Sequence, residues 1–276
     1  MIESFISLLI PLLLATLGGL YSEKAGILNI SLEGLLITSA FYSLAVLSFS
    51  GSLFLGILAG VMASLLLTLL FILSTLVLKS DPFVSGLGIN ILAYPLVLSS
   101  SRLLFGTEGT VRPENIPVPG TALFFVLALL LLLFTLIFFG RTNPGRLIAY
   151  CGGSEERICQ KGHSPQRIKF FALLLGSCFV GVAGASLSLP LGVFVPGMSA
   201  GKGWLALVAV YLAGGRGKGV FPAVALFAFF ELMAVNLQQF NSLPHDLVLS
   251  IPYFLTLLVT TLLKMFKKKH KSVRNR

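Results

Sequence analysis

Charged side chains are scarce in this 276-residue chain. They make up 11% of the residues, against about 25% in soluble domains, while 56% of the residues are hydrophobic. The apolar runs are continuous rather than alternating, which excludes an outer-membrane barrel and favours helices that satisfy their own backbone hydrogen bonds. The composition therefore predicts an all-α fold, specifically a polytopic integral membrane helical bundle.

Groups that carry catalytic chemistry are also few. Cys151, Cys159 and His163 lie close in the sequence without a fourth metal ligand, so we expect no metal site. The three cysteines, Cys151, Cys159 and Cys178, are expected to be reduced thiols. Two Gly-Lys-Gly triplets, 201–203 and 217–219, lack the first glycine and the final Ser/Thr of a phosphate-binding loop. No nucleophile stands beside a base, and no cofactor motif occurs. We therefore expect a protein that is not an enzyme and that holds no cofactor.

What the chain has in abundance is apolar sequence, divided into about nine hydrophobic segments. They are Ser4–Leu20, Ile30–Phe49, Leu53–Leu78, Phe83–Ser100, Leu123–Phe139, Phe170–Leu189, Trp204–Ala213, Val220–Asn236 and Leu247–Leu263. A span usually needs about 20 residues, so the short run from Trp204 is expected to be tilted, broken or re-entrant. We predict one transmembrane domain over residues 1–263 and a basic cytoplasmic tail over 264–276.

The basic residues predict the orientation of the bundle. With the N-terminus outside and the C-terminus inside, only Arg102, Arg112 and Lys202 of the 20 Lys and Arg residues fall outside. Cytoplasmic segments of membrane proteins are enriched in such residues, so this orientation is favoured. The tail is expected to anchor this topology and to bind no nucleic acid.

The longest polar interruption runs from Arg141 to Lys169, RTNPGRLIAYCGGSEERICQKGHSPQRIK. Ser154 can cap a helix of about two turns, and Gly162 offers a left-handed end. Glu155 and Glu156 stand in the first turn, where the helix dipole favours anions. A short helix on the inner surface predicts a docking element. The alternative is a basic connector held against anionic membrane lipid.

Polar residues also interrupt the apolar sequence between Gly18 and Gly34, GGLYSEKAGILNISLEG. Such groups are costly in a membrane unless they are paired or line a cavity. Asn29 or Ser31 can cap the next helix, whose first turn holds Glu33. Glu33 either complements its own helix end or shapes a transport pathway.

A second glycine-rich stretch, SGLGIN, places Gly86, Gly88 and Asn90 at the start of a span. Asn90 in a helix either forms an interhelical hydrogen bond or contacts a transported solute. Glu231, within another apolar run, is likewise either a bundle hydrogen-bonding group or a functional carboxylate.

The run YSEKAGILNISLEG resembles the N-terminal signature of permease subunits of ABC importers for nucleosides and simple sugars, which are related to the branched-chain amino-acid and ribose-type permeases. The signature joins a Ser-Glu-basic-Ala-Gly group, here Ser22–Gly26, to an Asn-x-x-x-Glu-Gly group, here Asn29–Gly34. Pro196–Gly215 is similar to the family's Gly-basic-Gly segment. The resemblance implies these pathway candidates: Asn29, Glu33, Gly86, Gly88, Asn90, Gly201 and Gly203.

In these permeases a comparable cytoplasmic loop carries an alanine-rich helix that docks in a groove of the ATPase subunit. Its counterpart here is Gly152–Gly162, GGSEERICQKG, which has Arg157 and Cys159 where small alanines are common. The resemblance implies that the residues that couple to the ATPase are Ser154, Glu155, Glu156, Arg157 and Gly162.

The resemblance thus implies a permease subunit of an ABC importer in the bacterial inner membrane, moving a nucleoside or a simple sugar. Riboflavin-like compounds are further candidates. The implied partners are an ABC ATPase subunit, a second homologous permease subunit and an extracytoplasmic substrate-binding protein. The alternative is an ion-coupled secondary carrier or channel for a small polar solute, in which Glu33, Glu231 and Asp246 couple to ions.

Overall fold

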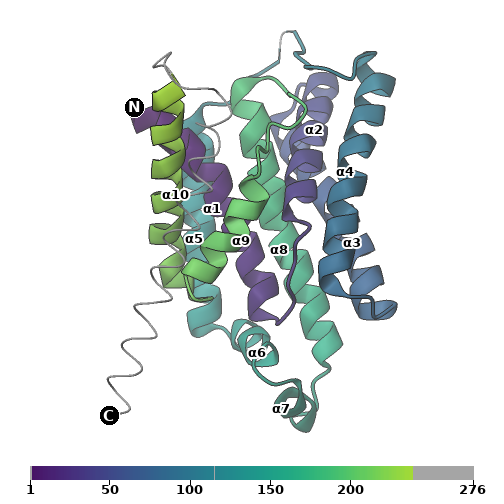
Figure 1. Cartoon of the computed structure of the whole chain (residues 1–276), viewed down its shortest axis with the longest axis vertical. Helices are drawn as coiled ribbons and strands as arrows, with labels where there is room; N and C mark the ends of the chain where they lie inside the picture. Colours follow the sequence, from purple (N-terminus) through teal and green to yellow (C-terminus); the bar gives the residue numbers. More distant parts are fainter. Residues whose placement is uncertain (1, 115, 239–276) are drawn as a thin grey trace.

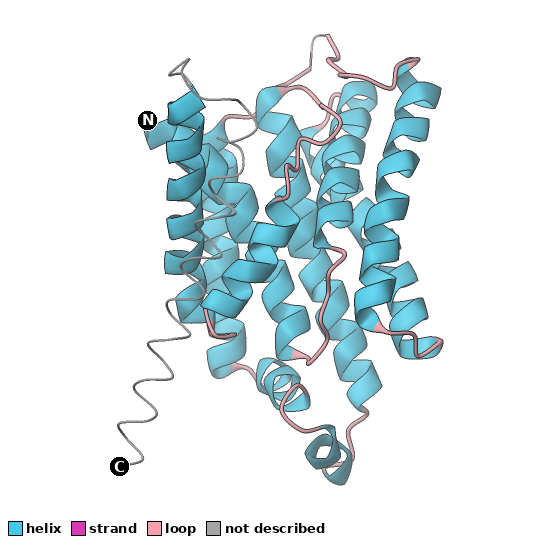
Figure 2. Ribbon diagram, viewed as in Figure 1, coloured by secondary structure: helices cyan, strands magenta, loops and turns pink. Residues whose placement is uncertain are grey.

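The computed structural model describes residues 2–114 and 116–238, and within them it contains helices and no named strand (Figures 1 and 2). Seven of these helices are long and apolar enough to cross a membrane. The predicted all-α membrane bundle is confirmed. Eight of the nine apolar runs correspond to helices, while the ninth, Leu247–Leu263, and the basic tail lie outside the described residues.

The bundle helices follow the order of the apolar runs. They are α1 (Ile2–Lys24), α2 (Leu32–Ser50), α3 (Leu53–Ile72) with the π-helical turn Leu73–Val77, α4 (Pro82–Phe105), α5 (Thr121–Arg141), α8 (Pro165–Ser188) with the 3-10 turn Leu189–Leu191, α9 (Lys202–Leu212) and α10 (Gly217–Gln238). Helix α9 has 11 residues, so the prediction that this run is short of a full span is confirmed.

Helices α1, α2 and α8 form the centre of the bundle. Of the most apolar window of each span, 72% is buried in α1 and α2 and 67% in α8, against 22% in α4 and 17% in α5. The exposed side chains of α5 include Leu130, Leu133 and Ile137, which suit contact with lipid chains. The peripheral helices thus surround a closely packed centre.

Glycines on α8 let three helices approach it. A β-carbon on Gly176 would lie 2.6 Å from the carbonyl oxygen of Gly18 in α1, and one on Gly181 would lie 2.5 Å from the α-carbon of Val61 in α3. A β-carbon on Gly184 would lie 2.7 Å from a carbonyl oxygen of α2. Packing of this kind, with small residues at the contact, holds membrane helices together where burial of apolar surface gives little driving force.

Two segments of the bundle are broken in the same way. After α1, an extended stretch returns into the bundle before α2 begins, and after α8 a loop does the same before α9 begins (Figures 1 and 2). From their adjacent starts, α2 and α9 run towards opposite ends of the molecule (Figure 1). The loop before α9 has left-handed backbone at Gly197, Ala200 and Gly201, which explains its small residues.

One end of the bundle carries the short helices α6 (Asn143–Cys151) and α7 (Glu155–Gln160), together with the α3–α4 and α9–α10 connections (Figure 1). The N-terminal end of α1 lies at the opposite end, near the α4–α5 loop. The prediction that Lys202 lies at the outer surface is wrong. Lys202 is 6% exposed and lies inside the bundle, because α9 starts there.

Candidate functional site

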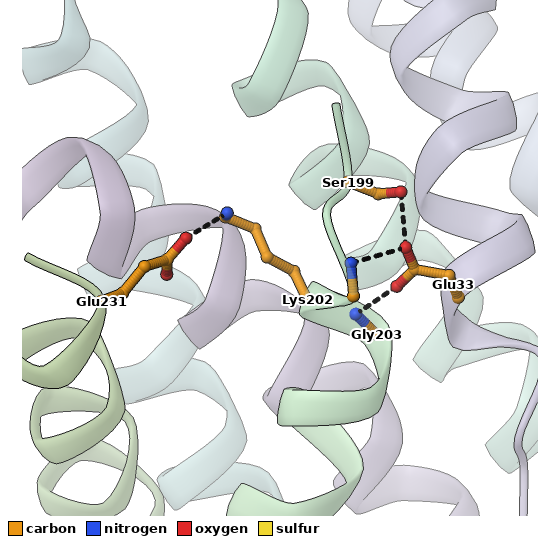
Figure 3. Close-up of polar contacts among 6 residues, drawn as sticks. Glu33, Ser199, Lys202, Gly203 and Glu231 are labelled. Carbon is orange, nitrogen blue, oxygen red and sulfur yellow. Dashed lines mark hydrogen bonds and ion pairs between the residues drawn. The ribbon is translucent and has the colours of Figure 1, made fainter. Parts of the chain in front are cut away.

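The start of α9 is held by a carboxylate from α2. One oxygen of Glu33, Oε1, accepts hydrogen bonds from the Ser199 hydroxyl (2.5 Å) and the Gly201 amide (3.0 Å), and Oε2 accepts one from the Gly203 amide (2.7 Å; Figure 3). Glu33 does stand in the first turn of α2, as predicted. Its carboxylate, however, complements the N-terminal end of α9 instead of its own helix.

The start of α2 is held in turn by α4. The Asn90 side chain accepts a hydrogen bond from the Gly34 amide (2.8 Å) and donates one to the Ile30 carbonyl (2.9 Å). Asn90 therefore forms interhelical hydrogen bonds, which is one of the two roles predicted for it. Asn29 acts locally, because its Oδ1 accepts from the Ser31 amide and hydroxyl, at 3.1 and 2.6 Å. Ser31 precedes α2 without a capping hydrogen bond from its side chain.

On the opposite side of the start of α9, Lys202 reaches α10 (Figure 3). Its ammonium forms an ion pair of 2.5 Å with Oε1 of Glu231, and the two side chains are 7% and 16% exposed. The second carboxylate oxygen of Glu231 has no hydrogen-bond partner among the described residues. Helix α9 is thus fastened at its first turn to α2 by Glu33 and to α10 by this pair.

A hollow of about 220 Å³ lies where these starts meet. Its lining residues come from α2, α4 and the loop before α9: Glu33, Gly34, Ile37, Asn90, Tyr94, Gly197, Ser199, Ala200 and Gly201. Three of the seven predicted pathway residues, namely Glu33, Asn90 and Gly201, are therefore brought together. The Tyr94 ring, which is 46% exposed, had no sequence signal beyond its place four residues after Asn90.

Gly86, Gly88 and Gly203, the remaining predicted glycines, are not in the lining of the hollow. A β-carbon on Gly203 would lie 2.4 Å from the Glu33 nitrogen, and one on Gly86 would lie 3.1 Å from the Ile30 nitrogen, so both allow close packing of the helix starts. Gly88 is exposed on α4 with no atom within 4 Å of its β-carbon position.

A second, larger cavity of about 490 Å³ lies on the other side of α9. Its walls come from α1, α5, α8, α10 and the loop before α9, and its polar side chains are Ser4, Ser7, Thr121, Ser186 and Lys202. The ammonium of Lys202 is already paired with Glu231, so this cavity offers hydroxyl groups and apolar surface.

The predicted short helix is present as α7, which has six residues and begins after Ser154. The prediction that the Ser154 side chain caps this helix is wrong, because its hydroxyl makes no capping hydrogen bond. Gly162 ends the turn with left-handed backbone (φ 75°), as predicted. Glu155 pairs with Lys169 at the start of α8 at 2.5 Å, and the Glu156 and Arg157 side chains are exposed.

Sequence reasoning missed helix α6, which begins after Thr142. The Thr142 hydroxyl accepts a hydrogen bond from the Gly145 amide at 3.2 Å, and Pro144 occupies the first turn. A Thr before an early Pro is a helix-start signal, and it was readable in the sequence.

The α6–α7 junction touches the end of α1. A β-carbon on Gly152 would lie 2.4 Å from the carbonyl oxygen of Lys24, and one on Gly26 would lie 2.9 Å from the α-carbon of Gly152. Residues 25–31 lead from this contact to the start of α2. The exposed helix α7 is therefore joined, through backbone contacts, to the segment that carries Glu33.

Comparison with known proteins agrees with this architecture. The family model described as "Branched-chain amino acid transport system / permease component" matches residues 1–260. The guanosine ABC transporter permease protein NupQ of Bacillus subtilis is 28% identical, over 91% of this chain and 88% of its own. The nucleoside ABC transporter permease protein NupC of Lactococcus lactis is 25% identical over the same shares.

The putative glucose ABC transporter permease protein TsgC13 of Haloferax volcanii is 29% identical, over 83% of this chain and 75% of its own. No solved structure matches the chain significantly. The family match covers most of the chain, and seven helices of its described part are long and apolar enough to span a membrane. This chain therefore belongs to the branched-chain amino acid transport system permease family and is a multi-pass membrane transport subunit.

Proposed function

We propose that the chain is the membrane permease of an ABC importer for a nucleoside, with simple sugars as the second candidate class. The names of two of the three relatives refer to guanosine or nucleosides, and the name of the third refers to glucose. The observation that carries the importer assignment is helix α7, an exposed element joined to the helix starts around Glu33 through Gly152 and Gly26.

The proposed partners are an ABC ATPase subunit, an extracytoplasmic substrate-binding protein and a second permease subunit. The ATPase binds α7 through the residues from Ser154 to Gly162. When the ATPase subunits close, they move α7 together with the end of α1, and the spans rock about the junction of α2, α4 and α9. Asn29, Gly86 and Gly203 shape the pathway by packing at or beside this junction, and Gly88 does so by leaving open space on α4.

Uptake measurements test the substrate class. We expect deletion of the gene in the native host to reduce uptake of radiolabelled guanosine to background while glucose uptake stays unchanged. Loss of glucose uptake alone would select the sugar class. Uptake that survives ATP depletion but stops with a protonophore would contradict the importer assignment and favour the ion-coupled carrier.

The proposed orientation places α7 in the cytoplasm, and two cysteines there test it. Cys159 is exposed on α7, whereas Cys151 is buried. Burial raises the pKa of the Cys151 thiol, so the reactive thiolate is rarer at neutral pH. We expect a membrane-impermeant maleimide to label Cys159 in inside-out vesicles and not in right-side-out ones, with Cys151 protected in both.

The Cys159→Ser variant is the control for this labelling. Inside-out vesicles that contain this variant should lose the maleimide labelling assigned to Cys159. Labelling of Cys159 only from the outer face would reverse the proposed orientation.

A further inference from the structure

The hollow between α2, α4 and α9 has an unusual electrostatic arrangement. Two helices begin beside it, and the N-terminal end of a helix carries about half a positive charge and unpaired amides. In transporters with broken helices, such ends commonly hold an anionic group of the solute. Here both ends are already occupied by side chains of the protein itself.

The occupation is specific at both ends. At α9, the Glu33 carboxylate takes the amides of Gly201 and Gly203 at 3.0 and 2.7 Å. At α2, the Asn90 carbonyl oxygen takes the Gly34 amide at 2.8 Å. Lys202, the buried cation within the described part of the chain, is paired with Glu231 on the far side of α9.

Among the described residues, a solute that enters the hollow therefore meets no uncompensated positive group. The charge of Glu33 balances the partial charges of the two helix ends, so the site is close to neutral. An anionic solute would give up its hydration without gaining a partner, which is unfavourable for a charged group that enters the protein. A neutral solute has no such cost, and the partly exposed Tyr94 ring offers it an apolar face.

We propose that the hollow is a binding site for neutral ring-shaped solutes, and that Glu33 is a built-in anion that excludes carboxylates and phosphates from it. This inference rests on the proposed function for its solute class, which it narrows to uncharged nucleosides or sugars over amino acids, sugar acids and nucleotides. Glu33 is accordingly a specificity-determining residue, and its three hydrogen bonds also position α9.

Thiol modification in the hollow tests the inference without requiring transport. Ile37 lies one turn after Glu33 on α2 and lines the hollow, so Ile37→Cys is the reporter and Tyr94→Cys is a second one. The full chain is used in membrane vesicles, with Cys159 and Cys178 replaced by serine. Rates of reaction with an anionic and a neutral methanethiosulfonate reagent are measured, and their ratio is compared with that for a free thiol in solution.

With Glu33 present, we expect the anionic-to-neutral ratio in the hollow to be no higher than that of the free thiol. The Glu33→Gln variant keeps a hydrogen-bond acceptor but removes the negative charge. We expect it to raise the anionic-to-neutral ratio about tenfold, because a unit charge beside the hollow repels an anionic reagent strongly. The matched control is Ser186→Cys in the second cavity, where Glu33→Gln should leave the ratio unchanged.

Three results would overturn the inference. They are an unchanged ratio in Glu33→Gln, an equal rise at the Ser186→Cys control, and no reaction of either reagent at both hollow reporters. If the thiol results are as expected but neither guanosine nor glucose is transported, the proposed substrate fails while the neutral site stands.

Discussion

The Glu231→Ala variant is expected to lose about 3–5 kcal/mol of folding free energy, because it leaves a buried ammonium without its partner. The Lys202 side chain is 7% exposed, and its ion pair with Glu231 joins the first turn of α9 to α10. Detergent-solubilised protein should therefore show a much lower melting temperature, measured by thermal denaturation followed by size-exclusion chromatography.

An exposed ion pair supplies the matched control for this change. Glu108 pairs with Arg102 at 3.2 Å, and their side chains are 56% and 74% exposed. Exposed pairs contribute about 0–1 kcal/mol, so Glu108→Ala should leave the melting temperature nearly unchanged. The double variant Lys202→Met/Glu231→Leu removes both charges and should recover much of the loss. Equal melting temperatures for Glu231→Ala and Glu108→Ala would contradict the buried pair.

The double variant Glu155→Lys/Glu156→Lys is expected to abolish ATP-driven uptake while the protein remains folded in the membrane. Both acids stand in the first turn of α7 and are exposed, so they lie on the surface proposed to meet the ATPase. Reversing two charges on a docking surface changes its electrostatic match to the partner, and juxtaposed like charges cost several kcal/mol of binding. Substrate uptake, normalised to the amount of permease in the membrane, measures the effect.

The Lys169→Ala variant distinguishes loss of ATPase docking from loss of the ion pair that stabilises α7. It breaks the Glu155–Lys169 ion pair but leaves the charges of α7 unchanged, so uptake should persist. Full uptake by the double lysine variant would show that α7 is not the element that couples to the ATPase.

Much of the fold was predictable because it follows from local sequence. The apolar runs predicted the membrane bundle, and the short run that begins at Trp204 predicted the partial span α9. Gly56 and Gly60 on α3 have the four-residue spacing typical of close helix packing, and the Ser43 hydroxyl of α2 would lie 2.1 Å from a β-carbon on Gly60. These features depend on spacing and composition within one segment.

The partners of the site residues were not predictable in the same way. Glu33 binds amides about 170 residues later in the chain, and Lys202 pairs with Glu231 across two helices. Such contacts depend on how the helices pack, which no local pattern specifies. Counting Lys202 as an outer charge failed because a loop that folds back into the bundle has the same composition as one that stays outside.

Copurification tests whether this permease works with a separate ATPase. The chain is tagged in its native host, extracted in mild detergent and purified, and its partners are identified by mass spectrometry. The importer account predicts recovery of an ABC ATPase, together with a second permease subunit. Reproducible isolation of this chain alone, in a form that transports solute in vesicles without ATP, would contradict it.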